Sequence, residues 1–310
     1  MKAFIGMTDF DWFTHVSALG KIDEVNFWQP KRKQSFQALR PGEPFLFKLY
    51  SPLNFIVGGG FFAHSTFLSV GLAWNLFGQK NGAGSLLEMQ RRIEQYVPSG
   101  SLATGDYQIG CVVLEQPFFF TRDEWIPAPK DWKPNIVRGK KYDLTSGLGK
   151  DLWEEVQFRL VARSDGLQDA PVTVEVTDDS EGLGLSALRL GEGSFRVVVI
   201  DAYGRRCAVT QERTLPALEA AQIKPSGEGG PRSIQNGILL RSDIRRLLDA
   251  GYVTISCDYR LEVSRRIREE FENGRAYYAL EGSFLNVPHS KELQPAPEYI
   301  RWHNEHLFRS

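Results

Sequence analysis

The stretch that decides the fold of the C-terminal half runs from Arg205 to Gly251 and reads RRCAVTQERTLPALEAAQIKPSGEGGPRSIQNGILLRSDIRRLLDAG. Three polar residues divide it, since Asn236 follows Gln222 by 14 positions and Arg245 follows Asn236 by 9. Short groups surround these residues: CAVT (207–210), LEAAQI (218–223), EGGP (228–231), NGILL (236–240) and DIRRLLDAGYV (243–253). These groups, at these intervals, are specific enough to be compared with known families.

The stretch resembles the nuclease core of the HNH endonucleases, and the resemblance covers most of Phe195–Phe308. The later segments FENGRAYYALEG (271–282) and WHNEHLF (302–308) resemble the end of that domain. The resemblance implies an α+β, ββα-metal fold, in which a strand pair and a helix surround one divalent ion. It also implies three roles: a histidine ending the first strand is the general base, an asparagine fixes the loop, and a histidine or asparagine on the helix binds the metal.

Gln222 and Arg245 stand at the two positions where the family carries histidines, and Asn236 stands at the asparagine position. The amide of Gln222 cannot accept a proton near neutral pH, so the roughly 10²–10⁴-fold contribution of a general base is lost. The guanidinium of Arg245 has only donors and cannot ligate a metal. Since the metal activates the water and stabilises charge, we expect weak or absent hydrolysis and no bound cofactor, whereas active relatives use Mg²⁺ or another divalent metal.

Arg245 also suggests a binding role. The metal of an active member is a positive charge beside the scissile phosphate, and an arginine can hold a phosphate bidentately instead. Lys224, Arg241 and Arg246 are the other candidate nucleic-acid-binding residues of this half. The hypothesis predicts salt-sensitive DNA binding that needs no Mg²⁺.

Two alternatives would leave the chain an active nuclease. Asp243 and Asp249, together with Asp258, could form a displaced metal site, although such acids more often cap a helix or pair with nearby arginines. His303 and His306 could replace the base or the ligand, although a histidine beside a tryptophan is more often packed and hydrogen-bonded. Both alternatives depend on side chains that the sequence alone does not bring together.

The N-terminal half carries a second resemblance. VNFWQP (25–30), LRPGEPFLFKL (39–49) and FIVGGGFFA (55–63) resemble the EVE-like modules of the PUA superfamily, with an early tryptophan, a Pro-Gly turn into a strand and a glycine-rich strand. The resemblance implies a β-barrel with helices whose pocket accepts a base flipped out of the duplex, often a modified cytosine. The candidate nucleic-acid-binding residues here are Trp28, Phe62, Asn135 and Lys140.

Local signals divide the chain into an EVE-like module (1–150), a helix and linker (151–193) and the HNH-like domain (194–310). SLLEMQRRIEQYV (85–97) is amphipathic and begins with a capping-box pattern, Ser85 with Glu88. We also expect a strand over 109–120, helices over 67–77 and 153–162, and a short strand in PVTVEV (171–176). SFRVVVIDAYG (194–204) is compatible with either a strand or a short helix.

Composition limits the class of protein. The 310 residues carry a formal net charge of -1, so DNA binding would depend on local basic patches. The three cysteines are far apart and form neither a disulfide framework nor a zinc motif. No signal peptide and no apolar run of about 20 residues is visible. We therefore expect a soluble, cytoplasmic protein without a membrane partner.

Together, the sequence predicts a DNA-binding protein of the HNH endonuclease family, related to restriction of modified DNA, with weak or lost nuclease activity. A homodimer is expected, because duplex cleavage needs two strand cuts. One alternative is a non-catalytic reader of modified DNA or a partner subunit of an active relative. The other is a metal-dependent endonuclease with a relocated metal site.

Overall fold

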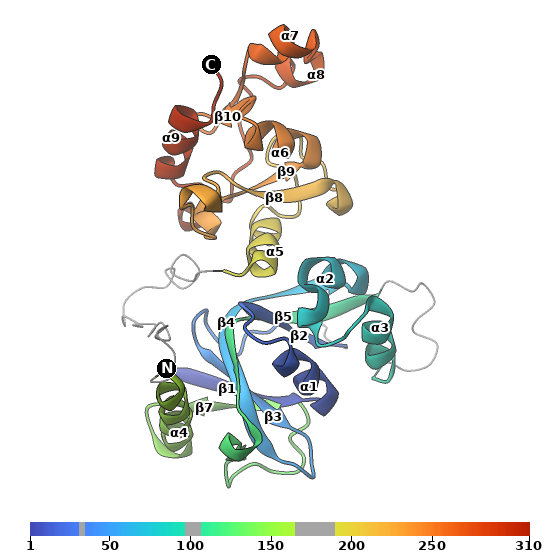
Figure 1. Ribbon diagram of the computed structural model, residues 1–310, viewed down its shortest axis with the longest axis vertical. Coiled ribbons are helices and arrows are strands. Elements are labelled where there is room, and N and C mark those ends of the chain that lie inside the picture. Colours follow the sequence, from blue (N-terminus) through green and yellow to red (C-terminus); the bar gives the residue numbers. More distant parts are fainter. Residues whose placement is uncertain (31–34, 97–106, 165–189) are drawn as a thin grey trace. The chain divides into compact units, whose positions relative to one another are not determined.

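The computed structural model describes residues 1–30, 35–96, 107–164 and 190–310, and the chain divides into two compact units (Figure 1). Unit 1 is Met1–Ser180 and unit 2 is Glu181–Ser310. The division falls inside the segment 151–193 that the sequence suggested as helix and linker. The short strand expected in PVTVEV and the basic cluster KRK (31–33) lie outside the described residues.

Unit 1 is a mixed α+β unit built around one large sheet. Its elements are β1 (Lys2–Thr8), α1 (Phe10–Ala18), β2 (Glu24–Gln29), β3 (Pro44–Leu49), β4 (Phe55–Ser69), α2 (Val70–Phe77), η1 (Gly78–Asn81), α3 (Leu86–Glu94), β5 (Gln108–Phe119), η2 (Arg122–Glu124), β6 (Ile126–Pro127), β7 (Gly139–Asp143) and α4 (Gly147–Ser164). The sheet order is β2-β5-β4-β3-β1-β7, with β6 added beside β4. β1 pairs in parallel with β3, and the other pairings are antiparallel.

The sheet of unit 1 is open, which corrects the predicted β-barrel. Among the described strands β2 pairs with β5 alone and β7 pairs with β1 alone, so these two strands are edges. A barrel would require its first and last strands to pair. Closure was implied by the resemblance to the EVE-like modules. Local strand and turn signals specify neighbouring hairpins but do not determine whether distant edges meet, so the sequence offered no check on that implication.

Alternating side chains of β3 make two cores, one on each face of the sheet. Phe45 and Phe47 point to the face covered by α1 and pack with Trp12 and other aromatic rings. Leu46 points to the opposite face and belongs to the cluster that α4 supplies with Leu152, Trp153 and Val156 (Figure 1). This period of two is the ordinary strand geometry, and it makes α4 part of unit 1.

The glycines of β4 allow its neighbours to approach closely. A Cβ added to Gly58 would lie 2.2 Å from the Phe118 carbonyl oxygen, and one added to Gly59 would lie 2.7 Å from the Phe45 carbonyl oxygen. The pairing of β4 with β5 also shifts register between Gly59 and Phe61. Close backbone approach and a bulge, the two usual reasons for glycine within a strand, therefore occur together here.

The amphipathic helix predicted after Ser85 is confirmed as α3. Ser85 caps it, since its hydroxyl accepts a hydrogen bond from the Glu88 N–H at 3.2 Å. The carboxylate of Glu88 reaches the Gly84 N–H at 2.8 Å rather than the N–H of Ser85, so the second half of the capping box is displaced by one residue. The helix expected over 67–77 begins later, because β4 continues to Ser69 before α2 starts.

Unit 2 begins with a helix and contains a ββα element. Its elements are α5 (Glu192–Ala202), η3 (Leu215–Ala217), β8 (Leu218–Gln222), η4 (Ser226–Glu228), η5 (Ile234–Asn236), β9 (Gly237–Arg241), α6 (Ser242–Asp249), β10 (Val253–Ile255), β11 (Leu261–Val263), α7 (Arg266–Phe271), α8 (Arg275–Tyr278), η6 (Lys291–Leu293) and α9 (Pro297–His306). β8 and β9 pair antiparallel, and α6 follows directly. The segment 194–204 is therefore helical, the second of the two possibilities left open by its sequence.

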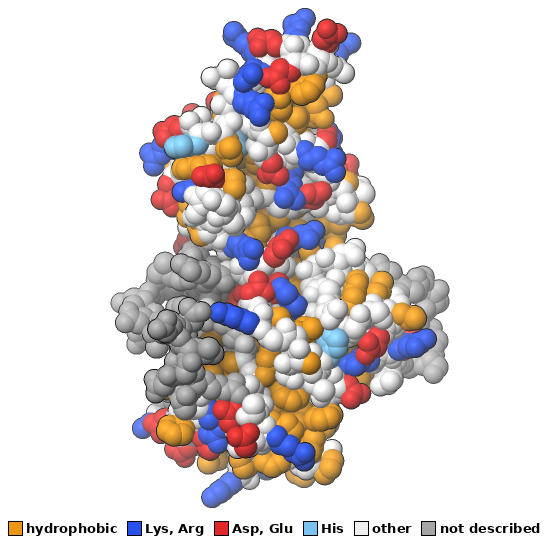
Figure 2. Space-filling model, in the orientation of Figure 1, with side chains coloured by type: hydrophobic (Ala, Val, Ile, Leu, Met, Phe, Trp, Pro, Cys, Tyr) orange, Lys and Arg blue, Asp and Glu red, His pale blue; other side chains and the backbone are white. Residues whose placement is uncertain are grey.

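The surface mixes charges of both signs. On the face that Figure 2 draws, the Lys and Arg side chains of the described residues are interspersed with Asp and Glu side chains and form no continuous basic stripe. This pattern agrees with the formal net charge of -1. Within the described ranges, no helix combines the length and the apolar character needed to cross a bilayer.

Candidate functional site

The three residues singled out in the C-terminal half all lie in the ββα element. Gln222 is the last residue of β8, Asn236 directly precedes β9, and Arg245 lies in the middle of α6. Residues 223–236 connect the two strands, and they include the EGGP group. The element therefore has the strand, loop, strand and helix order that the resemblance implied.

Asn236 ties the loop together and is completely buried. Its Oδ1 accepts a hydrogen bond from the Lys224 N–H at 2.8 Å, and its Nδ2 donates to the carbonyls of Lys224 at 2.8 Å and Pro231 at 2.9 Å. Gly230 permits this closure, because a Cβ there would lie 1.9 Å from the Lys224 carbonyl oxygen. Asn236 thus satisfies three partly buried backbone groups, a structural role.

Both ends of the Gln222 amide are hydrogen-bonded to the loop. Its Oε1 accepts a hydrogen bond from the Ser226 hydroxyl at 2.8 Å, and its Nε2 donates to the Pro231 carbonyl at 3.2 Å. An amide oxygen in this arrangement has no basicity to offer a water molecule. The side chain at the general-base position therefore stabilises the loop.

Arg245 is held by two carboxylates. Its Nη1 contacts Glu219 Oε2 on β8, and its Nε lies 3.3 Å from Asp249 Oδ2 on the same helix. Burial raises the pKa of Asp249, opposed by the guanidinium of Arg245 and reinforced by the charge of Glu219. One positive and two negative groups thus form a compact cluster, in which the Arg245 side chain is 37% exposed.

The residues present do not fit the divalent metal that the fold family uses. In the part of the chain that the structure describes, no group of three histidine, cysteine or acidic side chains could hold an ion. Asp243, one half of the suggested displaced site, pairs bidentately with Arg241 at 2.7 and 2.8 Å. Asp249, the other half, pairs with Arg245. These two acids are thus each matched by an arginine, the arrangement that the sequence offered as the alternative, and Asp258, the third acid considered, is exposed on the loop after β10.

The C-terminal histidines are engaged elsewhere. His303 is buried, with Nδ1 2.7 Å from the Thr254 hydroxyl and Nε2 3.0 Å from the Leu248 carbonyl oxygen. Burial lowers the pKa of His303. His306 is exposed and its ring stacks on Trp302 at 4.9 Å. These contacts are packing and hydrogen-bonding contacts, with no sign of an imported base.

The candidate cations of unit 2 differ in availability. Arg241 is neutralised by Asp243, and the Lys224 ammonium lies 5.2 Å from the ring centre of Trp302. Arg246 is exposed on α6 and makes no ion pair with any described residue. Arg246 and Lys224 are therefore better placed than Arg241 to meet a phosphate.

Unit 1 contains a cavity of about 280 Å³ with aromatic walls. Its aromatic rings come from α1, from β2 and from the residues just after β3 and α3. Its charged and amide side chains are those of Asp9, Gln29 and Arg138. The lining includes Trp12, Phe27, Trp28, Tyr50, Tyr96, Asp9, Gln29, Val137 and Arg138. Trp28, predicted as a stacking residue, is among them.

Asp9 is the negative group of this cavity. Its Oδ1 caps α1 by accepting from the Trp12 N–H at 3.0 Å, and its Oδ2 lies 3.4 Å from the Tyr96 hydroxyl. Burial together with the charge of Asp9 raises the pKa of Tyr96 to about 12. The same two causes raise the pKa of Tyr50. Both phenols therefore stay protonated at neutral pH and can donate hydrogen bonds.

The tryptophans at this cavity differ in their hydrogen bonding. The Trp28 indole donates to the Asn81 carbonyl at 2.8 Å, which orients its ring beside that of Tyr96 at a centroid distance of 6.4 Å. The indole Nε1 of Trp12 is buried and finds no acceptor among the described residues. Buried donors without acceptors are uncommon, but this nitrogen lies against Gly82 and is closed to a ligand.

The other predicted binding residues of unit 1 do not line the cavity. Phe62 is 5% exposed and packs in the core against Phe36. Lys140 pairs with Asp131 and lies over the Tyr142 ring. Asn135 is exposed, two residues before Val137 in the segment that reaches the cavity. The sequence missed Asp9, Tyr50, Tyr96 and Arg138, because only the Asp9 helix-capping position carries a local signal.

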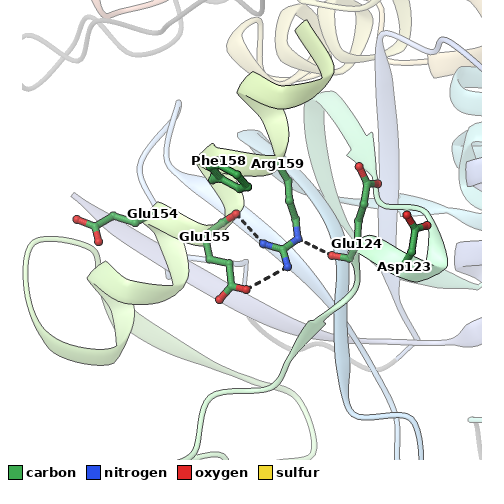
Figure 3. Close-up of a pocket in the computed structure, with 6 residues that line it drawn as sticks. All are labelled: Asp123, Glu124, Glu154, Glu155, Phe158 and Arg159. Carbon is green, nitrogen blue, oxygen red and sulfur yellow. Dashed lines mark hydrogen bonds and ion pairs between the residues drawn. The ribbon is translucent and has the colours of Figure 1, made fainter. Parts of the chain in front are cut away.

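A second, open depression of unit 1 is acidic (Figure 3). Asp123 and Glu124 border it from η2, and Glu154 and Glu155 border it from α4. Arg159 crosses it, donating to the Glu124 carbonyl at 2.6 Å and to the Glu155 carboxylate at 3.0 Å. Its cation thus joins α4 to η2, while the surplus of carboxylates disfavours a nucleic acid here.

Comparison with known proteins places a family in unit 2. Residues 207–256 match the HNH endonuclease family, and this stretch includes Gln222, Asn236 and Arg245. No curated protein sequence matches the chain.

Solved structures show similarity to both halves at low identity. Unit 1 contributes the likeness to the ASCH protein from Zymomonas mobilis, at 10% identity and a TM-score of 0.31, covering 49% of this chain and 94% of that one. The modification-dependent TagI restriction endonuclease is similar at 14% identity and a TM-score of 0.27, covering 92% and 75%. The phosphorothioation-dependent restriction endonuclease ScoMcrA is similar at 10% identity and a TM-score of 0.20, covering 78% and 48%.

Proposed function

We propose that this protein binds DNA carrying a modified base, cytosine in particular, and that its HNH domain cleaves weakly or not at all. The aromatic cavity of unit 1 carries the proposal. It combines stacking surfaces, a single carboxylate and an arginine within about 280 Å³. A base extruded from the duplex needs these groups, because it is held by stacking and recognised at its hydrogen-bonding edge.

The polar groups of the cavity suggest which base it accepts. The Asp9 carboxylate only accepts hydrogen bonds, so it favours the exocyclic amino group of cytosine or adenine. Thymine carries a carbonyl oxygen where cytosine carries that amino group, and two acceptors repel each other. Arg138, exposed at the cavity, is suited to a neighbouring phosphate, which fixes register rather than sequence.

The HNH domain supplies binding surface rather than chemistry in this proposal. Gln222 has both ends of its amide hydrogen-bonded, and Arg245 is paired with Glu219 and Asp249. Neither residue can supply the base or the ligand that hydrolysis requires. The protein would act as a reader or as the partner subunit of an active relative. Homodimer formation stays a prediction.

The test is DNA binding in EDTA, measured by fluorescence anisotropy. Duplexes would differ at one central position, carrying cytosine, 5-methylcytosine, 5-hydroxymethylcytosine or thymine. We expect a modified cytosine to bind most tightly, and Trp28→Ala to weaken that binding about 5- to 150-fold, since stacking on an aromatic ring contributes about 1–3 kcal/mol per base.

Phe158→Ala is the matched control, because Phe158 is an aromatic residue 74% exposed at the acidic depression of the same unit. Equal affinities for all four duplexes, or equal losses in the two variants, would contradict the proposed reading site. Binding that disappears in EDTA would contradict the metal-independent mode.

A further inference from the structure

We infer that Arg245 is a built-in cation of the ββα element, which clamps β8 to α6 and takes the place of a divalent ion. The inference starts from a disagreement: the fold family implies a metal here, but the side chains do not fit one. Two carboxylates, Glu219 from the strand and Asp249 from the helix, converge on one guanidinium. The cation that neutralises them is covalently part of the chain.

The charge balance explains why this cation matters. Glu219 and Asp249 are half-buried, with 31% and 48% of their side chains exposed. Two carboxylates brought together in such surroundings repel each other unless a cation lies between them. Arg245 can meet both at once because its Nη1 faces the strand while its Nε faces the helix. A long planar fork with several donors is suited to this bridging.

The same geometry argues against phosphate as the partner of Arg245. A guanidinium already bound to two carboxylates belongs to a cluster with a net charge of about -1, which repels a phosphate. Freeing it would leave both acids unpaired, at a cost that a half-exposed phosphate contact would hardly offset. The hypothesis that Arg245 holds DNA is therefore replaced by one in which it holds the fold.

Without Arg245, the ββα element would contain a potential binding site for a divalent cation. Removing the guanidinium would leave two carboxylates on opposite elements with a gap between them. Mg²⁺ and Mn²⁺ bind proteins through one or two carboxylates and keep several waters. An Arg245→Ala variant should therefore acquire a divalent-cation dependence that the natural protein lacks.

Thermal unfolding of the full-length protein tests this inference without reference to nuclease activity. In EDTA we expect Arg245→Ala to lower the Tm of unit 2 by about 3 °C, the scale of a partly exposed ion-pair cluster in a domain of this size. Millimolar Mn²⁺ should recover most of this loss and leave the natural protein unchanged. Arg246→Ala is the matched control, because Arg246 is the adjacent arginine of α6 and makes no ion pair with the described residues.

Two further variants keep the test decisive if Arg245→Ala folds poorly. Arg245→Met with Glu219→Gln and Asp249→Asn removes cation and anions together, so it should be more stable than Arg245→Met alone and indifferent to Mn²⁺. Mn²⁺ bound to each variant would be counted by electron paramagnetic resonance. Equal Tm values for Arg245→Ala and Arg246→Ala in EDTA would overturn the inference, as would Mn²⁺ binding to the natural protein at this cluster.

Discussion

The cavity of unit 1 and the ββα element of unit 2 contain similar polar groups in opposite states. In the ββα element, the side chains of Gln222, Asn236 and Arg245 all contact groups of the same element, although the Arg245 Nε, which lies 3.3 Å from Asp249, makes no hydrogen bond to a described residue. At the cavity, the Asp9 carboxylate keeps acceptor capacity, because Oδ1 accepts one hydrogen bond from the Trp12 N–H and Oδ2 has only a long contact of 3.4 Å with the Tyr96 hydroxyl. One region is closed by its own contacts, and the other still has hydrogen-bonding groups to offer a ligand.

The difference indicates where binding energy remains available. A polar group that is already satisfied contributes to stability and gains little from a ligand, whereas an unsatisfied one gains the whole interaction. Nuclease activity would require different side chains in the ββα element. DNA recognition requires only that a ligand bind in the cavity of unit 1.

The largest expected effect comes from placing histidines at the Gln222 and Arg245 positions of the ββα element. The double variant Gln222→His/Arg245→His would restore a general base and a metal ligand, so we expect Mg²⁺- or Mn²⁺-dependent nicking of plasmid DNA to rise at least about 10²–10⁴-fold over the natural protein. Gel analysis of nicked circles, with EDTA as control, measures the rate. Nicking by the unaltered protein that EDTA abolishes would instead indicate a relocated metal site.

Removing the buried asparagine should cause the next largest effect. Asn236→Ala would leave the Lys224 N–H and two carbonyls without their partner, and we expect unit 2 to lose about 3 kcal/mol of unfolding free energy. Urea denaturation followed by circular dichroism measures the loss. Asn273→Ala, at an exposed asparagine of the same unit, is the control; similar midpoints for the two variants would show that the loop does not need Asn236.

A change at Asp9 tests the open region. Asp9→Asn keeps a side chain that caps α1 but replaces one acceptor oxygen by a donor. We expect the preference for cytosine over thymine at the extruded position to fall about tenfold, while the Tm stays within a degree or two. Competition binding with the four duplexes provides the measurement. An unchanged preference would remove Asp9 from the recognition site.

The smallest effect concerns the buried histidine. Burial lowers the pKa of His303 in the folded protein, so the unfolded chain takes up a proton first as the pH falls. Stability is therefore complete above the unfolded pKa of about 6.5 and decreases as the pH drops toward the lower folded value. We expect His303→Gln to reduce this slope between about pH 5 and 7, with exposed His306→Gln unchanged. The same dependence of stability on pH in the natural protein and in both variants would contradict this prediction.

Much of the local architecture followed from short-range signals. Ser85 marks the start of α3. The strand pair, the loop held by Asn236 and the helix carrying Arg245 were implied by the resemblance of 205–251 to the HNH endonucleases, and the structure has this order. The open sheet could not be predicted, because closure depends on whether β2 and β7 meet across the unit. The sequence also could not show which residues line the cavity. Four of them are spread over about 130 residues of sequence: Asp9, Tyr50, Tyr96 and Arg138.

The sequence by itself predicted, through its resemblance to the HNH endonucleases, that Gln222 and Arg245 stand at histidine positions, and chemistry alone then excludes a proton acceptor at Gln222 and a metal ligand at Arg245. Only the tertiary structure decided what these residues do instead. It brings Glu219 of β8 to the guanidinium of Arg245, which helix geometry alone already places beside Asp249, and it brings the Pro231 carbonyl to the amide of Gln222. The physical reason is that a side chain's chemistry is local, whereas its partners are set by how distant elements pack.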